Sequence, residues 1–143
     1  MVEKLKILFL CTGNSCRSQM AEGWARHLKS DSIQAFSAGL EAHGLNPNAV
    51  QVMQEAGVDI TGQKSQKMEE VETIPFDFVI TVCDHADENC PIFSCSTTVV
   101  HFGFDDPPKL AEKAKTEEEA LNHYSRVRDA IRTFVETLPE VLW

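Results

Sequence analysis

Short, nearly continuous apolar runs along the chain predict four buried strands. The first covers residues 6–11, and its lack of alternation is typical of a strand that is covered on both faces. The others cover residues 33–38, 76–83 and 97–102, and the last two are rich in β-branched and aromatic residues. Because helical segments separate these runs, we expect an α/β fold with a four-stranded, mostly parallel sheet that is flanked by helices.

Apolar residues also recur at helical spacing, which predicts three helices. The apolar face of the first helix is formed by Met20, Ala21, Trp24, Ala25 and Leu28. Asn46 and Pro47 are typical of an N-cap and a first helical position, and Gly57 is expected to end this second helix. Thr116 and Glu119 form a capping-box pattern ahead of a long amphipathic third helix.

The length and composition predict one folded domain that covers residues 1–143. The 22 acidic residues outnumber the 13 Lys and Arg residues, so the formal net charge is -9. This charge argues against nucleic acid and against an anionic membrane as the main partner. Because residues 7–10 form only a short apolar run, we expect neither a signal peptide nor a membrane span, and we expect a cytoplasmic protein.

Five cysteines stand out in this composition, namely Cys11, Cys16, Cys83, Cys90 and Cys95. In a reducing compartment, cysteines are more often catalytic, redox-active or metal-bound than joined in structural disulfides. Cys11 and Cys83 end the first and third predicted strands, and residues 105–108 follow the fourth. Parallel sheets bind ligands at the carboxyl ends of their strands. We therefore expect these three segments to converge at one edge of the sheet.

A loop that suits a tetrahedral oxyanion follows the first strand. It consists of Cys11, Thr12, Gly13, Asn14, Ser15, Cys16, Arg17 and Ser18. The backbone N–H groups of such a loop can form an anion-binding nest, and the next helix adds partial positive charge. We expect residues 12–17 to surround the anion, with Arg17 binding two of its oxygens. Gly13 is expected to adopt a backbone conformation closed to other residues, and Asn14 to tolerate a positive φ.

Cys11 is the predicted nucleophile of this loop. We expect the positive surroundings to lower the pKa of Cys11, so that a thiolate lies beneath the bound anion. Ser18 is expected to donate a hydrogen bond that keeps this thiolate or helps it leave. The Cys16 side chain is interpreted as a packed small residue. The alternative for the motif is a buried cysteine at a strand end, followed by an ordinary helix cap.

Residues 11–22 resemble the start of the thioredoxin-coupled arsenate reductases, which are built on the low-molecular-weight tyrosine phosphatase fold. The resemblance continues through residues 37–39, 82–91, 103–107 and 124–129. It implies the same fold and the reduction of arsenate to arsenite, with thioredoxin as the electron donor and no bound cofactor. We expect a monomer whose ligands are arsenate and its analogues phosphate and sulfate.

In the reaction that this resemblance implies, Cys11 attacks arsenate and Asp106 protonates the oxygen that leaves. Cys83 then attacks the Cys11 sulfur, which releases arsenite and leaves a disulfide. Cys90 attacks Cys83 in turn. The resulting disulfide reaches thioredoxin only if the polar segment between these two cysteines loosens. Asp105 is an equally good acid on spacing alone, and only the resemblance selects Asp106.

A phosphatase of the same fold is the first alternative, because it would use the same loop and the same acid. It would hydrolyse phosphomonoesters and would not need Cys83 or Cys90. Phosphatases of this fold usually carry an aromatic residue where Pro108 stands here, to grip a phosphotyrosine ring. The sole tyrosine, Tyr124, lies on the predicted apolar face of the last helix.

A non-catalytic anion or zinc sensor is the second alternative. Its candidate ligands are Cys83, His85, Cys90 and Cys95. Their spacing lacks a Cys-x2-Cys knuckle, so we expect no metal site. The five histidines, at positions 27, 43, 85, 101 and 123, are interpreted as surface or packing residues. Some members of the resembled family hold a monovalent cation with residues that match Asn14, Glu22 and Ser37, but Gln66 stands where an acidic ligand is expected.

Overall fold

The computed structural model describes residues 4–93 and 96–142. It contains a four-stranded sheet in the order β2-β1-β3-β4, and every neighbouring pair is parallel. The strands are β1 (Leu5–Cys11), β2 (Ile33–Gly39), β3 (Phe78–Thr81) and β4 (Thr98–His101). The predicted α/β fold is confirmed. The third strand is shorter than predicted, because Phe76 lies in a turn and Cys83 already caps the next helix.

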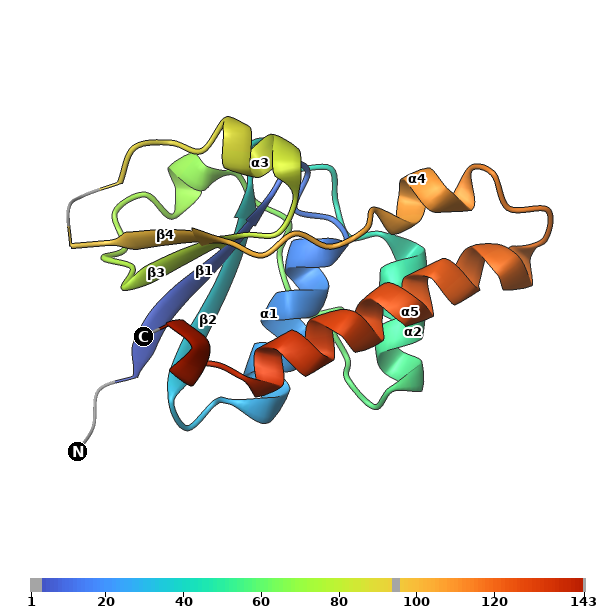
Figure 1. Ribbon diagram of the computed structural model, residues 1–143, viewed down its shortest axis with the longest axis horizontal. Coiled ribbons are helices and arrows are strands. Elements are labelled where there is room, and N and C mark those ends of the chain that lie inside the picture. Colours follow the sequence, from blue (N-terminus) through green and yellow to red (C-terminus); the bar gives the residue numbers. More distant parts are fainter. Residues whose placement is uncertain (1–3, 94–95, 143) are drawn as a thin grey trace.

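Helices cover both faces of this sheet. They are α1 (Arg17–Leu28), α2 (Pro47–Glu55), α3 (Asp84–Glu88), α4 (Pro107–Ala111) and α5 (Glu117–Glu136), with short 3-10 helices η1 (Met68–Glu70) and η2 (Glu140–Leu142). Figure 1 shows α1 and α5 on one side of the sheet, and α3 and η1 on the other. The predicted N-cap of α2 is present, because the Asn46 side chain accepts from the backbone of Asn48 and Ala49. At α5, Thr116 accepts from the Glu119 backbone, but the Glu119 carboxylate accepts from the Lys115 N–H, so only half of the predicted capping box forms.

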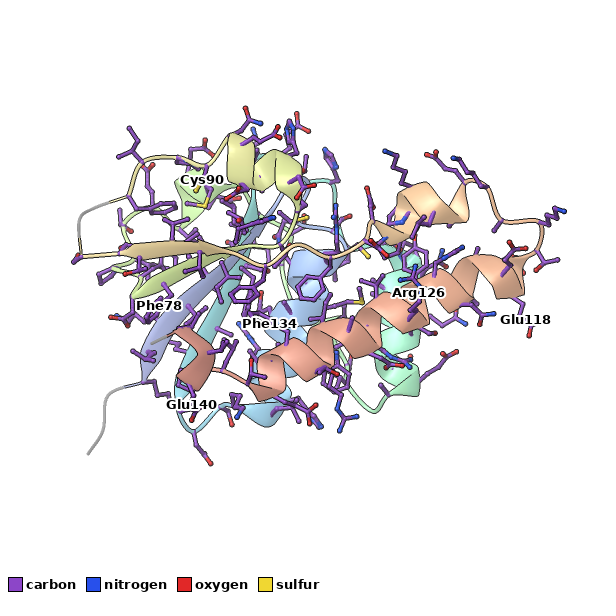
Figure 2. The ribbon with its side chains drawn as sticks, viewed as in Figure 1. Phe78, Cys90, Glu118, Arg126, Phe134 and Glu140 are labelled. Atoms are coloured by element: carbon purple, nitrogen blue, oxygen red, sulfur yellow. The ribbon has the colours of Figure 1, made fainter. Side chains whose placement is uncertain are left out.

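The core is centred on β1, which confirms a strand covered on both faces. Residues 7–10 have no exposed surface. Trp24 of α1 is buried, and its indole N–H donates to the backbone oxygen of Arg128 on α5 at 3.1 Å. On α5, Val135 is fully buried, whereas Phe134 is half-buried and stacks against Phe102 with ring centroids 4.4 Å apart (Figure 2). These contacts join α1 and the segment after β4 to α5.

All four strands direct the next segment of chain to the same edge of the sheet. The segment after β1 leads into α1, the one after β3 into α3, and the one after β4 into α4 (Figure 1). Residues 105–108, expected as a loop, are partly helical, because two prolines at the first positions of α4 preset the helical φ. Within residues 4–93 and 96–142, no helix is long and apolar enough to cross a membrane.

Candidate active site

The segment that follows β2 holds the predicted oxyanion loop in shape. The backbone N–H groups of Glu41 and His43 donate to the carbonyls of Thr12 and Gly13, each at 2.8 Å. The N–H of residue 46 donates to the carbonyl of residue 15 at 3.0 Å. A loop whose carbonyls are bound on its outer side presents its N–H groups on the inner side. The loop therefore has the form of an anion-binding nest.

Asn14 is the internal brace of this loop. It is fully buried and has a φ of 47°, which confirms the expected positive φ. Its side-chain oxygen accepts from the backbone of Gln66 at 2.8 Å, and its Nδ2 donates to Ser18 Oγ at 2.9 Å. The donation from Ser18 to the thiolate stays a prediction. The reason given for Gly13 is wrong: its φ is not positive, and the missing Cβ instead makes room for the His43 imidazole.

The loop opens into a cleft of about 360 Å³. The residues that line it are Cys11, Thr12, Gly13, Ser15, Cys16, Arg17, His43, Asn46, Asp106 and Pro108. Cys16 is buried, and this burial raises the pKa of its thiol to about 12, so it stays a thiol. The structure thus brings the expected nucleophile, the expected guanidinium and one carboxylate together at a single opening.

Asp105 and Asp106, the neighbouring carboxylates in the segment after β4, have separate partners. Asp106 lines the cleft, and its Oδ2 lies 3.6 Å from a guanidinium nitrogen of Arg17. Arg17 also donates to the backbone oxygen of Phe104 at 2.9 Å, which fixes its direction. Asp105 instead forms a 2.9 Å ion pair with Arg126 on α5 (Figure 2). Spacing along the sequence left these two acids equivalent, and the fold places only Asp106 at the cleft.

His43 is an exposed residue, as expected, and it also lines this cleft. Its ring lies against Gly13, and its Nε2 lies 2.8 Å from Glu41 Oε2. The topology of the sheet could have predicted its place at the cleft. The segment after β2 leaves the sheet at the same edge as the oxyanion loop, so its polar side chains were candidates for the rim.

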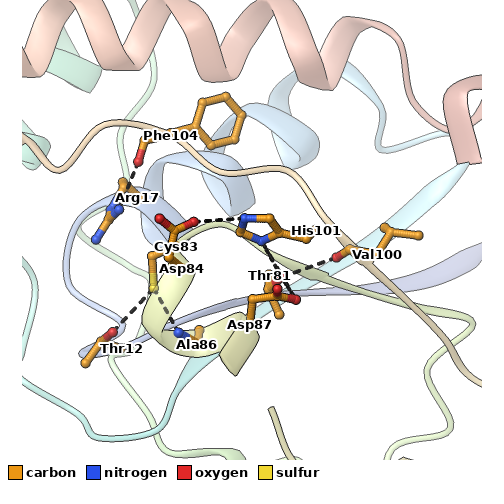
Figure 3. A network of polar contacts seen from close by, with 10 residues as sticks. All are labelled: Thr12, Arg17, Thr81, Cys83, Asp84, Ala86, Asp87, Val100, His101 and Phe104. Carbon is orange, nitrogen blue, oxygen red and sulfur yellow. Dashed lines mark hydrogen bonds and ion pairs between the residues drawn. The ribbon is translucent and has the colours of Figure 1, made fainter. Parts of the chain in front are cut away.

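The Cys83 side chain lies against Thr12 of the oxyanion loop. Its sulfur is 3.3 Å from Thr12 Oγ1 and accepts the Ala86 backbone N–H at 3.4 Å (Figure 3). The Cys11 thiol also bonds to it. The hydrogen bond from Cys11 is the main cause that lowers the pKa of Cys83 to about 5, helped by Thr12, Ala86 and Arg17. The expectation of a lowered pKa for Cys11 is wrong in this arrangement. The bond to Cys83 and burial raise the pKa of Cys11, and they outweigh Arg17.

This thiol pair predicts a titration that is measurable in the reduced, anion-free protein. The ultraviolet absorbance of one thiolate should appear with a midpoint near pH 5, because the pKa of Cys83 is lowered to about that value. Cys83→Ser should abolish this step. Cys16→Ser is the matched control and should retain it, because the pKa of Cys16 is raised to about 12. A midpoint near 5 that persists in Cys83→Ser would assign the thiolate to another residue.

Cys90 lies two residues beyond the end of α3 and is half-buried (Figure 2). Burial and the nearby charge of Asp87 both raise the pKa of its thiol. Cys95, a proposed zinc ligand and a bystander in the relay, lies outside the described residues. Among the residues that are described, no three histidine, cysteine or acidic side chains gather in a way that could hold a metal ion.

A polar cluster lies behind the oxyanion loop, where the resemblance implied a cation site in some relatives. Ser37 donates to the buried carboxylate of Glu22, which also pairs with Arg26 at 2.8 Å. Burial raises the pKa of Glu22. The Gln66 side chain donates to the backbone oxygen of Ser37 at 3.0 Å. These hydrogen bonds join β2, α1 and the segment before η1 behind the anion-binding loop.

Comparisons with known proteins agree with this geometry. The chain is 47% identical over 140 residues to a protein named arsenate reductase from Halalkalibacterium halodurans, covering 95% of this chain and 99% of that one. It is 49% identical to the arsenate reductase of Bacillus licheniformis, with the same coverage. Among solved structures, an arsenate reductase in its oxidized state covers 96% of this chain and 98% of its own, with 31% identity and a TM-score of 0.78.

The same fold occurs in a low molecular weight protein tyrosine phosphatase from T. tengcongensis, which is 22% identical and has a TM-score of 0.74. The alignment covers 96% of this chain and 99% of the phosphatase chain, and at this identity the likeness shows the fold alone.

 Residues 6–142 match the family described as low molecular weight phosphotyrosine protein phosphatase. The chain therefore belongs to the low molecular weight phosphotyrosine protein phosphatase family, and its relatives at 47 to 49% identity carry the name arsenate reductase.

Proposed function

We propose that this protein reduces arsenate to arsenite through Cys11, Cys83 and Cys90, and that a thioredoxin regenerates it. The observation that carries the proposal is the hydrogen-bonded pair of Cys11 and Cys83, of which Cys11 lines the cleft of the oxyanion loop. A hydrolase of this fold needs one thiol at this place, whereas a reductase needs a second thiol to receive the first sulfur. The names of the relatives support the same reaction.

The first step is the attack of Cys11 on the arsenic of bound arsenate. Thr12 to Arg17 bind the oxyanion through backbone N–H groups and the guanidinium. The pair of thiols holds one negative charge, and a hydrogen that moves along their hydrogen bond makes Cys11 the thiolate. An arsenic–oxygen bond breaks as the sulfur–arsenic bond forms, and Asp106 supplies the proton with which the oxygen leaves as water.

The second step moves two electrons to arsenic. Cys83 attacks the Cys11 sulfur, and the proton that Cys83 gained in the first step passes to an oxygen on arsenic. The electron pair of the sulfur–arsenic bond stays on arsenic, which leaves as arsenite. Cys90 then loses its proton and attacks Cys83, so Cys11 departs as a thiolate and a disulfide joins Cys83 to Cys90. A dithiol of the thioredoxin class reduces that disulfide. The four cysteines that the structure describes are unpaired. We expect the relay to work in a reducing, cytoplasmic setting.

Two observations favour reduction over phosphotyrosine hydrolysis. Pro108 lines the cleft at the place where an aromatic wall would be expected. Tyr124 is buried, and its hydroxyl accepts a hydrogen bond from Asn46 Nδ2 at 3.1 Å, so it supports the rim rather than stacking on a substrate.

Phosphate and sulfate share the shape and charge of arsenate, so we expect them to bind the cleft as competitive inhibitors.

Arsenate-dependent oxidation of NADPH, coupled through thioredoxin and thioredoxin reductase, tests this function. The wild type should turn over continuously. Cys90→Ser should release about one arsenite per molecule and then stop, because the disulfide between Cys11 and Cys83 has no internal thiol to resolve it. Cys16→Ser is the matched control and should turn over continuously.

The alternatives give different results in the same preparation. Sustained hydrolysis of an aryl phosphate by Cys90→Ser, without arsenate turnover in the wild type, would replace the reductase by the phosphatase. One equivalent of bound zinc, with neither activity, would favour the sensor. Arsenate turnover that survives in Cys90→Ser would overturn the role of Cys90 as the last thiol.

A further inference from the structure

Helix α3, which separates Cys83 from Cys90, has little apolar packing to hold it. Of its five residues only Ala86 is buried. A helix this short is not stable on its own. Its polar contacts therefore decide whether it stays folded. At its start the Ala86 N–H donates to Cys83 Sγ, and at its end the Asn89 side chain donates to the backbone oxygen of His85 at 2.9 Å.

His101, the last residue of β4, joins the side of α3 to the sheet (Figure 3). Its Nε2 lies 3.1 Å from Asp84 Oδ1, and its Nδ1 lies 2.8 Å from Thr81 Oγ1 on β3. The same hydroxyl lies 3.2 Å from Asp87 Oδ1. One imidazole thus holds two of the three carboxylates of α3, Asp84 directly and Asp87 through Thr81. The glycine at position 103 leaves space for the His101 ring, because a Cβ at this position would lie only 3.0 Å from His101 Nε2.

The hydrogen-bond donors in this network are the His101 ring and the Thr81 hydroxyl. Carboxylate oxygens accept, so the contact between Nε2 and Asp84 takes its hydrogen from the ring. The hydroxyl of Thr81 has one hydrogen and faces Nδ1, Asp87 and the backbone oxygen of Val100, so it links the ring to the second carboxylate. The charged groups that face His101, within the part of the chain described, are Asp84 and Asp87.

A disulfide between Cys83 and Cys90 requires α3 to move. Seven residues at the helical rise span about 10 Å, whereas the Cα atoms of a disulfide lie within about 7 Å of each other. Because α3 fills most of this interval, it must unwind or shift for the sulfurs to meet. Asp84 and Asp87 move with it. Their bonds to His101 and Thr81 therefore belong to the reduced protein.

We propose that His101 is a positioning residue that latches α3 to the sheet in the dithiol state and thereby weakens the disulfide between Cys83 and Cys90. This inference rests on the proposed relay. The latch bonds exist before Cys90 attacks Cys83 and are lost afterwards, so they stabilise the dithiol relative to the disulfide. A disulfide that is weakened in this way passes its oxidising equivalent more completely to an external dithiol, which itself becomes oxidised.

The reduction potential of the pair formed by Cys83 and Cys90 tests the latch without arsenate. The full chain, with Cys11 and Cys95 replaced by serine, is equilibrated in dithiothreitol redox buffers, and its free thiols are alkylated and counted by mass. We expect His101→Leu to favour the disulfide by about tenfold, which moves the potential of this two-electron couple about 30 mV more negative. Amide exchange in α3 of the reduced protein should also become faster.

Three further variants separate the latch from a general loss of packing. His101→Gln keeps an amide donor for Asp84 and should show less than half of the shift. Asp84→Asn leaves the sheet untouched and should shift the potential in the same direction, because it removes the carboxylate that Nε2 faces. Val99→Ala, on the same strand and 39% exposed, should leave the potential unchanged.

The possible failures are distinguishable. An unchanged potential in both His101→Leu and Asp84→Asn, or a shift to more positive values, overturns the latch and leaves the relay intact. If no disulfide forms between Cys83 and Cys90 in the parent protein, the relay itself is wrong, and the latch is withdrawn with it.

Discussion

The Cys11→Ser variant should still bind oxyanions but should not reduce arsenate. We expect kcat for arsenate reduction to fall by about 10⁴-fold or more, because a serine hydroxyl is not ionised near neutral pH and its oxygen cannot replace a thiolate. The cleft keeps its N–H groups and Arg17, so phosphate affinity, measured by calorimetry, should stay within about tenfold of the wild type. Arsenite formation is measured directly, in a single-turnover experiment with excess protein.

Cys16→Ser is the matched control for this loss, because Cys16 lines the same cleft and is equally buried. Its thiol stays protonated, since burial raises its pKa to about 12, so it has no part in the chemistry. We expect its kcat to stay within about threefold of the wild type. Equal losses in the two variants would show that the loop needs both sulfurs for its shape, and Cys11 would lose its place as the nucleophile.

Much of this fold could be predicted from local sequence patterns, because these patterns reflect burial and backbone geometry directly. A continuous apolar run such as residues 7–10 fits only a strand covered on both faces, and these residues are fully buried. The N-cap at Asn46 and the stop at Gly57 depend on backbone geometry that few residues can supply. The helices α3 and α4 were missed because five residues are too few to show a helical period.

The site was harder to predict where it depends on contacts between distant segments. The sequence shows Arg17 near Cys11, which led to the expectation of a lowered pKa for Cys11. It does not show that Cys83 lies within hydrogen-bond reach, and this partner reverses the direction. The places of His43 and His101 could not be predicted for the same reason, since each meets its partners only after parallel strands bring separate loops to one edge. The choice between Asp105 and Asp106 also needed the position of α5.

Asp106→Asn should separate the acid of the first step from its neighbour. We expect kcat to fall by about 10²- to 10⁴-fold, the usual range for loss of a general acid, because an amide cannot protonate the departing oxygen. Asp105→Asn is the matched control. Its carboxylate pairs with Arg126 at 2.9 Å on an exposed surface, so its kcat should stay within about threefold of the wild type.

The ion pair between Asp106 and Arg17 allows a second explanation of such a loss, and KM distinguishes the two. Asp106 Oδ2 lies 3.6 Å from the guanidinium, so its removal frees one side of Arg17. Arg17 remains anchored through its 2.9 Å bond to the Phe104 carbonyl, which predicts that it keeps its direction. If Asp106 is the proton donor, Asp106→Asn therefore lowers kcat and changes KM by less than about threefold. A rise in KM that accounts for most of the loss would make Asp106 a positioning residue for Arg17, and the departing oxygen would need another acid.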